Sequence, residues 1–418
     1  MWRATKGDRG GVSAPPQAAA RLYVLDGLRL VAALTVVLYH YVSLPGGWGS
    51  DPNAIFPTLH KFAQYGWLGV DLFFLISGFV ICMSAWGRSL GDFVVSRASR
   101  LYPAYWAGIL LTTGVLTVWP QVYKADDLDI ILSNFSMLQT GLNVPDVDGA
   151  YWTLFTELRF YIVFAIVVAT GVTYRKCVLF CGIWTVGAMI TPKVGNDLLA
   201  TWTMPAYSPY FVAGIAFFLM YRFKPNAVLW GIVGISFVLA QHYVELRMKI
   251  NLGDPHYTSV PGWPVRFTIL LCFAVMAGAA LGRFDRVQWK WLTTAGALTY
   301  PLYVIHMYIG MTIIRQFRDR VPAATLLVGV VALMVPVAWA IHRFVERPTG
   351  KLLRDSLKRG MAEIRRDSAS ATPKPAPPAP AADVRHAFDG HGTEHAGTEH
   401  AYDPQSSATI IGQATPPS

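Results

Sequence analysis

The chain has 418 residues, of which 53% are hydrophobic and only 14% are charged, and its mean hydropathy is +0.38. This composition excludes a soluble globular protein of this length and predicts a membrane protein. The formal net charge of +10 does not indicate nucleic acid as a partner, because the basic residues are scattered among short polar segments and the two tails.

Hydrophobic blocks separated by short polar segments recur along the chain, and a helix needs about 20 consecutive apolar residues to cross the hydrocarbon of a bilayer. We therefore predict an all-α, polytopic membrane protein with about ten transmembrane helices. The predicted spans are residues 22–42, 66–85, 102–119, 154–171, 177–191, 205–221, 227–240, 265–281, 292–314 and 323–342.

The two ends of the chain are predicted to lie outside the membrane domain. Residues 1–20 are polar and precede a block that is longer than a signal peptide, so we expect an N-terminal tail and a retained first span. Residues 21–350 should form the transmembrane domain. Residues 351–418 should form a mostly disordered tail, because the sequence beyond about Lys358 becomes rich in Pro and Ala.

The distribution of Lys and Arg predicts the orientation. Basic residues are more frequent in the segments that face inward if the N-terminus is cytoplasmic, which favours a topology with both termini in the cytoplasm. Arg315, Arg318 and Arg320 contradict this bias, because the same topology places all three on the outer side.

Neither the cysteines nor the C-terminal tail predicts a metal site. The four cysteines lie in or beside hydrophobic blocks without a CxxC pair, which is typical of small buried side chains rather than of disulfides or metal ligands. Four tail histidines, at positions 386, 391, 395 and 400, could bind a metal loosely, but a solvated low-complexity tail is the better interpretation.

The first span carries two ionisable residues, Arg29 and His40, eleven positions apart. At 100° per residue their side chains differ by about 20° around the helix and lie about 16 Å apart along it, so they share one face. Ionisable residues inside a membrane are functional candidates by default. The structural alternative is an arginine whose side chain extends to the membrane–water interface and a histidine whose hydrogen bonds are satisfied within the protein core. Asp26 is placed to pair with Arg29.

The second span begins with GWLGVDLFFLISGFVI, which places Asp71 at its outer end, at about the depth of His40. A carboxylate there could orient the imidazole, as the acid of a catalytic dyad does. The alternative is a carboxylate stabilised by the helix dipole. In the same span, Ser77 and Gly78 are predicted to allow close helix packing.

Arg97 and Arg100, in the segment SRASRLYPAYW, lie three residues apart before the third predicted span. Two guanidinium groups on one helical face would form a good phosphate clamp. Cytoplasmic anchoring of the span is the structural alternative.

Three more ionisable residues lie at or inside later spans. Glu157 enters the fourth span in YWTLFTELRFY and could hold a sugar hydroxyl, or pair with Arg159 or with a cation of another span. His306, in LTYPLYVIHMY, is buried in the middle of its span, and a structural hydrogen bond is the favoured interpretation. Glu346, in RFVERP, is predicted to form a cap or an ion pair with an arginine at the inner face.

The order of these motifs resembles the acyltransferase-3 family of bacterial membrane O-acyltransferases. LDGLRLVAALTVVLYHY, GVDLFFLISGFVI, SRASRLYP, YWTLFTELRFY, LYVIH and FVERP follow one another over roughly residues 21–350. The resemblance implies an inner-membrane enzyme that moves an acyl group, usually acetyl, from cytoplasmic acyl-CoA to a hydroxyl of a carbohydrate acceptor such as a surface polysaccharide or glycolipid. It also implies that Arg29 and His40 form the hallmark pair and that Arg97 and Arg100 contact CoA.

The resulting hypothesis assigns a role to each candidate residue. Arg29, Arg97 and Arg100 bind acyl-CoA, while His40, assisted by Asp71 and Glu157, performs the chemistry. An acyl-histidine intermediate stays open as a variant mechanism. No permanently bound cofactor or metal is expected; acyl-CoA is a donor substrate, and the other partners are the acceptor and membrane lipid. A transporter or flippase of a lipid-linked glycan is the alternative class.

Overall fold

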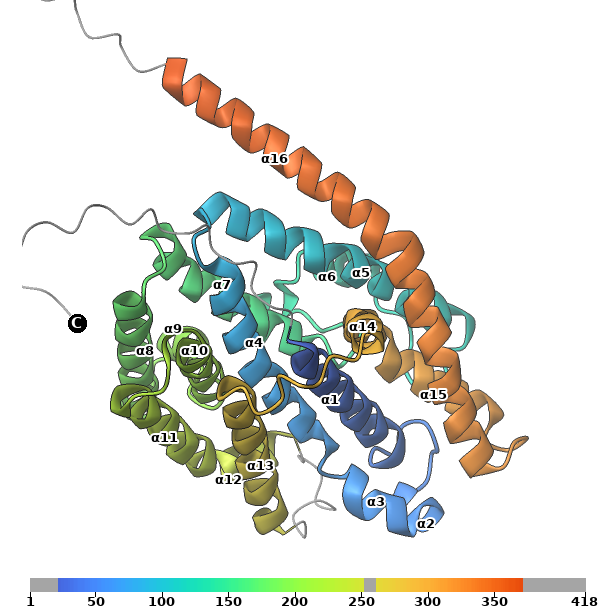
Figure 1. Cartoon of the computed structure of the whole chain (residues 1–418). Helices are drawn as coiled ribbons and strands as arrows, with labels where there is room; N and C mark the ends of the chain where they lie inside the picture. Colours follow the sequence, from blue (N-terminus) through green and yellow to red (C-terminus); the bar gives the residue numbers. More distant parts are fainter. Residues whose placement is uncertain (1–21, 252–260, 371–418) are drawn as a thin grey trace, which may run out of the picture. The chain divides into compact units, whose positions relative to one another are not determined.

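The computed structural model describes residues 22–251 and 261–370, and these residues form helices without a single strand (Figure 1). The predicted tail at residues 1–20 and the four tail histidines lie outside the described residues. Contacts divide the chain into two units, Met1–Asp367 and Ser368–Ser418. The helices are α1 (Tyr23–Val42), α2 (Pro52–Ile55), α3 (Pro57–Ala63), α4 (Gly69–Ala85), α5 (Leu90–Val118), α6 (Leu128–Asn134), α7 (Trp152–Ala169), α8 (Tyr174–Val194), α9 (Asp197–Thr203), α10 (Ser208–Phe223), α11 (Ala227–His242), α12 (Val244–Asn251), α13 (Gly262–Ala280), α14 (Trp291–Phe317), α15 (Ala323–Ala340) and α16 (Arg347–Ser370).

The predicted fold class is confirmed. In the part of the chain that the structure describes, nine helical segments are long and apolar enough to cross a membrane, and α11 is a shorter apolar helix of 16 residues. Each of the ten predicted spans coincides with one of these segments. The chain is therefore a multi-pass membrane protein.

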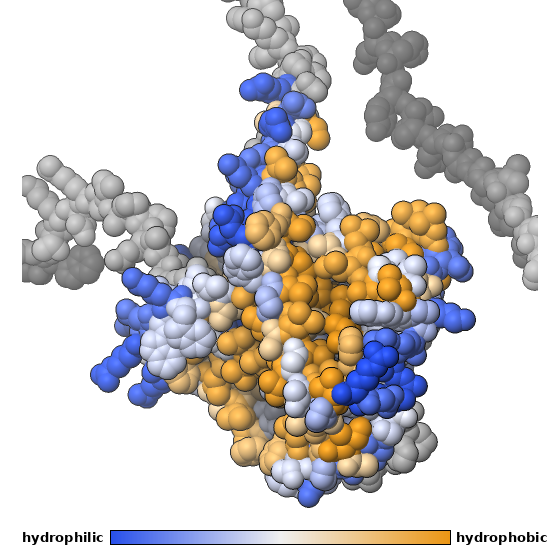
Figure 2. Space-filling model, turned by 90° about the vertical axis from the view of Figure 1, so that its right-hand side faces the viewer, coloured by the Kyte–Doolittle hydropathy of each residue, from blue (hydrophilic) through white to orange (hydrophobic). Residues whose placement is uncertain are grey.

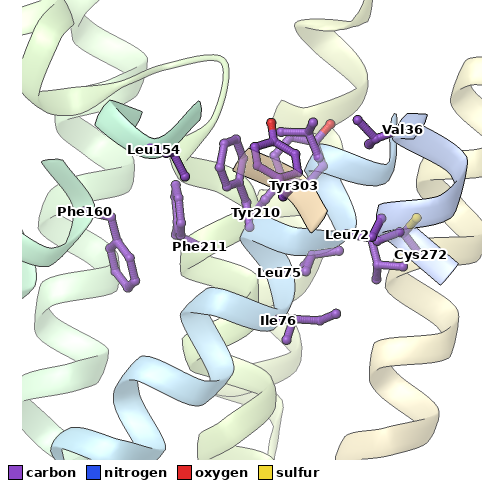
Figure 3. Packing of buried hydrophobic residues seen from close by; sticks show 14 of the residues in the cluster. Val36, Leu72, Leu75, Ile76, Leu154, Phe160, Tyr210, Phe211, Cys272 and Tyr303 are labelled. Atoms are coloured by element: carbon purple, nitrogen blue, oxygen red, sulfur yellow. The ribbon is translucent and has the colours of Figure 1, made fainter. Parts of the chain in front are cut away.

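Two helices are enclosed by the others. In α10 every residue from Ser208 to Met220 is buried, and most of α4 is buried as well, so both are hydrophobic around their whole circumference. They pack closely because Gly78 and Gly214 face each other, and a Cβ atom at either position would meet the backbone of the other helix. Figure 3 shows α4 side chains such as Leu75 within this apolar packing.

The outer helices present apolar side chains to the surroundings. Exposed large hydrophobic residues occur on α8, α11, α13 and α15, for example Ile183, Val238, Phe267 and Val328. Figure 2 shows a broad hydrophobic area on one face, with hydrophilic residues gathered at its margins. Such a surface is stable in contact with lipid and costly in water.

Helix α14 is the second organising element. It packs against α1, α5 and α15, while α4 contacts α1 on one side and α10 on the other. Residues from the N-terminal halves of α1, α5 and α14 line one common cavity, among them Asp26, Arg97 and Gly296. This arrangement gathers the polar residues of these three helices.

Helix α5 begins earlier than the predicted span at 102–119. Ser89 caps it by accepting a hydrogen bond from the backbone N–H of Asp92 at 3.1 Å, so the helix starts at Leu90 and includes Arg97 and Arg100. Arg97 and Arg100 therefore lie three residues apart on one continuous helix and share a helical face.

Two of the three arginines that contradict the charge bias, Arg315 and Arg318, contact the turn after α1. The Arg318 guanidinium donates to the backbone carbonyl of Trp48. Gly49, with φ of +68°, lies against Arg315 and Arg318, and a Cβ atom there would overlap both guanidinium groups. Arg315 and Arg318 thus hold the turn after α1 against the end of α14.

The last predicted span is followed by further helical residues. After α15 the chain forms a π-helix at Ile341–Glu346 and continues as α16 to Ser370, beyond the predicted domain end at residue 350. Within the π-helix, His342 Nδ1 lies 2.8 Å from Glu346 Oε2, so Glu346 pairs with a histidine and not with the arginine that the sequence predicted. All four cysteines are free and buried, as predicted.

Candidate functional site

A cavity of about 320 Å³ lies among α1, α4, α5, α7 and α14. Arg29, Arg97 and Arg100 all line it, and we call it the arginine cavity. Its lining extends along α4 from Ile81 to Val70, a rise of about 16 Å. The structure therefore brings together the three arginines that the sequence proposed for donor binding.

Two of these arginines are oriented by neighbours on their own helices. Arg29 Nη1 lies 3.8 Å from Asp26 Oδ1, which confirms the predicted pairing. Gly296 of α14 lies against Asp26, and a Cβ atom at that position would be 2.6 Å from Asp26 Oδ1. Arg97 Nη2 donates to Ser96 Oγ at 3.0 Å. The Arg97 Nε atom is buried and has no hydrogen-bond partner among the described residues.

Glu157 lines the same cavity, where its Oε1 accepts hydrogen bonds from Ser77 Oγ at 2.6 Å and from the Tyr161 hydroxyl at 2.5 Å. Arg159 points elsewhere: its Nη1 donates to the carbonyl of Thr201 at 2.9 Å, and its guanidinium lies 4.7 Å from the centre of the Phe155 ring. Residues two apart on a helix face different directions, so the alternative pairing of Glu157 with Arg159 is wrong.

His40 is not among the residues that line the cavity; it contacts His306 of α14. His40 Nδ1 is 2.9 Å from the carbonyl of Val36 and 3.1 Å from His306 Nε2. The two rings are 4.9 Å apart at an angle of 65°. Tyr303, which lines the cavity, packs with its ring 5.4 Å from that of His306, one helical turn earlier on α14. The histidine pair thus adjoins the cavity without lining it.

Asp71 is not the partner of His40. Its Oδ2 lies 2.5 Å from Arg247 Nη1, and the Tyr210 hydroxyl accepts a bond from the same guanidinium nitrogen at 3.1 Å. No hydrogen bond joins Asp71 to His40 within the described residues. Asp71 starts α4 next to α10 and α12, which is where Arg247 enters, so the predicted assistance of His40 by Asp71 is wrong.

Sequence patterns missed one important buried residue, Arg247, and undervalued another, His306. Arg247 lies in a polar segment between spans, where nothing marks it as a fully buried partner for Asp71. For His306 a signal existed, because an ionisable residue in the middle of a hydrophobic block is costly without a partner. No sequence pattern, however, indicated that the partner of His306 is His40.

The chain matches one protein family and several curated relatives. The acyltransferase-3 model, described as an acyltransferase domain, matches residues 22–343. An O-acetyl transferase of Shigella phage Sf6 is 26% identical over 362 residues, with 79% of this chain and 98% of the phage protein covered. The acyltransferase MdmB of Streptomyces mycarofaciens is 23% identical over 385 residues, with 81% and 94% covered. The exopolysaccharide production protein ExoZ of Rhizobium meliloti is 29% identical over 185 residues, with 41% and 56% covered.

No solved structure matches the chain. The family match covers well over half of the sequence and agrees with the apolar helices and with the motif order along them. It favours an enzyme over the alternative of a transporter or flippase. The chain belongs to the acyltransferase-3 family and is a multi-pass membrane acyltransferase.

Proposed function

We propose that the protein transfers an acyl group, with acetyl as the first candidate, from cytoplasmic acyl-CoA to a hydroxyl of a carbohydrate acceptor. The observation that supports this most is the arginine cavity, which leads from three guanidinium groups toward the histidine pair. Under this proposal the arginine end faces the cytoplasm of a bacterial inner membrane, both termini are cytoplasmic, and lipid covers the outer helices.

The charge of the cavity suits an anionic donor. Its lining carries three arginines against two carboxylates, Asp26 and Glu157. The CoA nucleotide is polyanionic, and guanidinium groups bind phosphate in a bidentate manner. The buried Arg97 Nε without a partner would gain one in this complex. The long acyl-bearing arm of CoA would then extend along α4 toward Tyr303.

The hydrogen bonds of the histidine pair determine which nitrogen of His40 can act as a base. His306 Nδ1 lies 2.7 Å from the carbonyl of Tyr303, and because a carbonyl only accepts, this nitrogen carries a proton. In the neutral ring His306 Nε2 is then an acceptor. His40 Nδ1 faces two acceptors, the Val36 carbonyl and His306 Nε2, so it also carries its proton. His40 Nε2 is left with a free lone pair.

This tautomer allows general-base catalysis by His40. His40 Nε2 takes the proton of the acceptor hydroxyl as the oxygen attacks the thioester carbonyl. The carbon–sulfur bond breaks, and the proton passes from His40 Nε2 to the departing CoA sulfur. The products are the acyl ester of the acceptor and free CoA. Attack of Nε2 itself on the thioester would give the acyl-histidine variant with the same tautomer.

The acceptor class is supported by the names of relatives. The phage protein is named an O-acetyl transferase, and the Rhizobium meliloti protein takes part in exopolysaccharide production. A surface polysaccharide or a glycolipid is accordingly the acceptor that we propose. Glu157, which the sequence offered as a contact for a sugar hydroxyl, lies among the donor-binding arginines, where its carboxylate balances their charge.

The test separates donor binding from chemistry. Acetyl-CoA binding to the purified protein is measured by calorimetry, and transfer of labelled acetyl groups to glycan is measured in membranes from cells that make the native acceptor. We expect Arg97→Ala and Arg100→Ala to weaken binding at least tenfold, and Arg175→Ala, an exposed arginine outside the cavity, to leave it unchanged. His40→Ala should bind the donor normally yet transfer nothing. Near-normal transfer by His40→Ala, or unchanged binding by both arginine variants, contradicts the proposal.

A further inference from the structure

We propose that His306 is a positioning residue for acyl transfer: its Nε2 holds the His40 ring in the tautomer and orientation that expose His40 Nε2 to the substrates. The inference rests on the proposed function, because it assigns a role to a residue that acts through the base. It differs from that function in naming a second histidine that never touches substrate.

The geometry leaves His306 no other role in the polar network. Its side chain is fully buried, with 0% exposed, and it does not line the arginine cavity. Both ring nitrogens are used, Nδ1 by the Tyr303 carbonyl at 2.7 Å and Nε2 by His40 Nδ1 at 3.1 Å. A histidine with a purely structural role would not need His40, the candidate base, as its hydrogen-bond partner.

The turn of α14 that carries His306 is fixed from α1. The Tyr41 hydroxyl donates to the backbone carbonyl of His306 at 2.6 Å. Tyr41 approaches this closely because residue 310, one turn further along α14, is glycine, and a Cβ atom there would overlap the Tyr41 ring. Tyr41 directly follows His40 in the sequence, so the same helical turn of α1 supplies the base and the clamp on its partner.

The same turn of α14 is also fixed from the segment before α7. The Tyr151 hydroxyl donates to the carbonyl of Val304 at 3.0 Å, and Asp148 Oδ2 accepts from the backbone N–H of Tyr308 at 3.0 Å. Both Tyr151 and Asp148 are fully buried. Three polar groups thus constrain the five residues centred on His306, which restricts the movement of its ring.

This restriction has a chemical consequence during transfer. When His40 Nε2 accepts the hydroxyl proton, its ring becomes positively charged, and the bond from His40 Nδ1–H to His306 Nε2 becomes charge-assisted and stronger. An interaction that strengthens in the transition state raises kcat rather than donor affinity. His306 should therefore affect the rate of transfer and leave donor binding unchanged.

Two variants separate positioning from packing. His306→Leu removes the acceptor at similar volume, whereas His306→Gln can place its amide oxygen near the position of Nε2. His242→Ala is the control, because His242 is an exposed histidine at the end of α11. Transfer from labelled acetyl-CoA is measured in membranes at several donor concentrations, and acetyl-CoA binding and thermal unfolding are measured on purified protein.

We expect His306→Leu to lower kcat about 100-fold or more with an unchanged donor KM, and His306→Gln to retain transfer within about tenfold of wild type. The inference is overturned if His306→Leu transfers normally, or if His306→Gln binds the donor but is as inactive as His306→Leu. If His306→Leu fails to fold, two other variants decide: His306→Gln and Tyr41→Phe, which frees the His306 carbonyl. The inference is supported if His306→Gln is active and Tyr41→Phe has a lower kcat. It is overturned if His306→Gln is inactive and Tyr41→Phe has a normal kcat.

Failure of this inference is distinguishable from failure of the proposed function. If His40→Ala is inactive while His306→Leu is fully active, the base assignment stands and only the role of His306 is wrong. If His40→Ala is itself active, the proposed chemistry is wrong, whatever the His306 variants do.

Discussion

Asp71 and Arg247 form a buried ion pair, with Oδ2 and Nη1 2.5 Å apart and both side chains almost completely enclosed. The Arg247 guanidinium also lies 5.0 Å from the centre of the Trp67 ring. The pair joins the start of α4 to α12. Burial alone would lower the pKa of Arg247, but the charge of Asp71 outweighs it and holds this pKa above its usual value. Asp71 therefore has a structural partner that accounts for its place in the second span.

Arg247→Met is expected to lower the free energy of unfolding by about 3–5 kcal/mol, because it leaves the Asp71 carboxylate buried without a counter-charge. The double variant Asp71→Asn/Arg247→Met should recover most of this loss. Glu245→Gln is the control, since the Glu245–Arg266 pair is exposed and should contribute at most about 1 kcal/mol. Thermal unfolding in detergent measures all three. A double variant as unstable as the single one would contradict the ion-pair explanation.

Asp148 predicts a pH dependence of stability. Burial raises the pKa of its carboxyl from 3.8 to about 7, although the N–H groups of Ala150 and Tyr308 partly oppose the shift. Between these two pH values the folded state keeps a proton that the unfolded state has lost, so stability falls as pH rises, by up to about 1.4 kcal/mol per pH unit. Above about pH 7 this contribution no longer changes.

The measurement is the unfolding temperature at several values between pH 4.5 and 8 for wild type and Asp148→Asn. In wild type the unfolding temperature should fall as the pH rises toward 7, and Asp148→Asn should lack the part of this fall that Asp148 causes. Asp129→Asn, at an exposed position, should follow the wild-type curve. Equal slopes for wild type and Asp148→Asn would show that Asp148 is not the titrating group.

Glu157→Gln tests the charge balance of the arginine cavity. The Glu157 carboxylate acts electrostatically on Arg29 and Arg97, and glutamine can still accept from Ser77 and Tyr161. Removal of the negative charge should therefore tighten acetyl-CoA binding several-fold. If Glu157 holds the acceptor instead, the variant will raise the acceptor KM and leave the donor Kd unchanged.

Gly296 allows α14 to approach α1 at Asp26. Gly296→Ala places a methyl group 2.6 Å from Asp26 Oδ1, so we expect a loss of about 1–3 kcal/mol in stability and weaker donor binding as Arg29 moves. Gly114→Ala on α5 meets no atom within 4 Å and should be neutral or slightly stabilising. Equal changes in stability and donor binding for Gly296→Ala and Gly114→Ala would show that the close contact of Gly296 with Asp26 is not important.

The sequence alone predicts the membrane class, the ten apolar helices and the family, because hydrophobic length and motif order are local properties. It also identifies Arg29, His40, Arg97 and Arg100, since charge in or beside a hydrophobic block is costly and therefore conspicuous. The order of the spans and the positive-inside bias suggest that the arginines share one end of the bundle, and the structure places them in one cavity.

Only the tertiary structure decides how these residues are paired. The sequence joined Asp71 to His40 by depth alone, but depth does not specify which neighbouring helix a side chain faces. Helix packing places α12 beside Asp71 and α14 beside α1, so Asp71 meets Arg247 and His40 meets His306. Partners more than 170 residues apart in sequence leave no local pattern, because their contact depends on how whole helices pack.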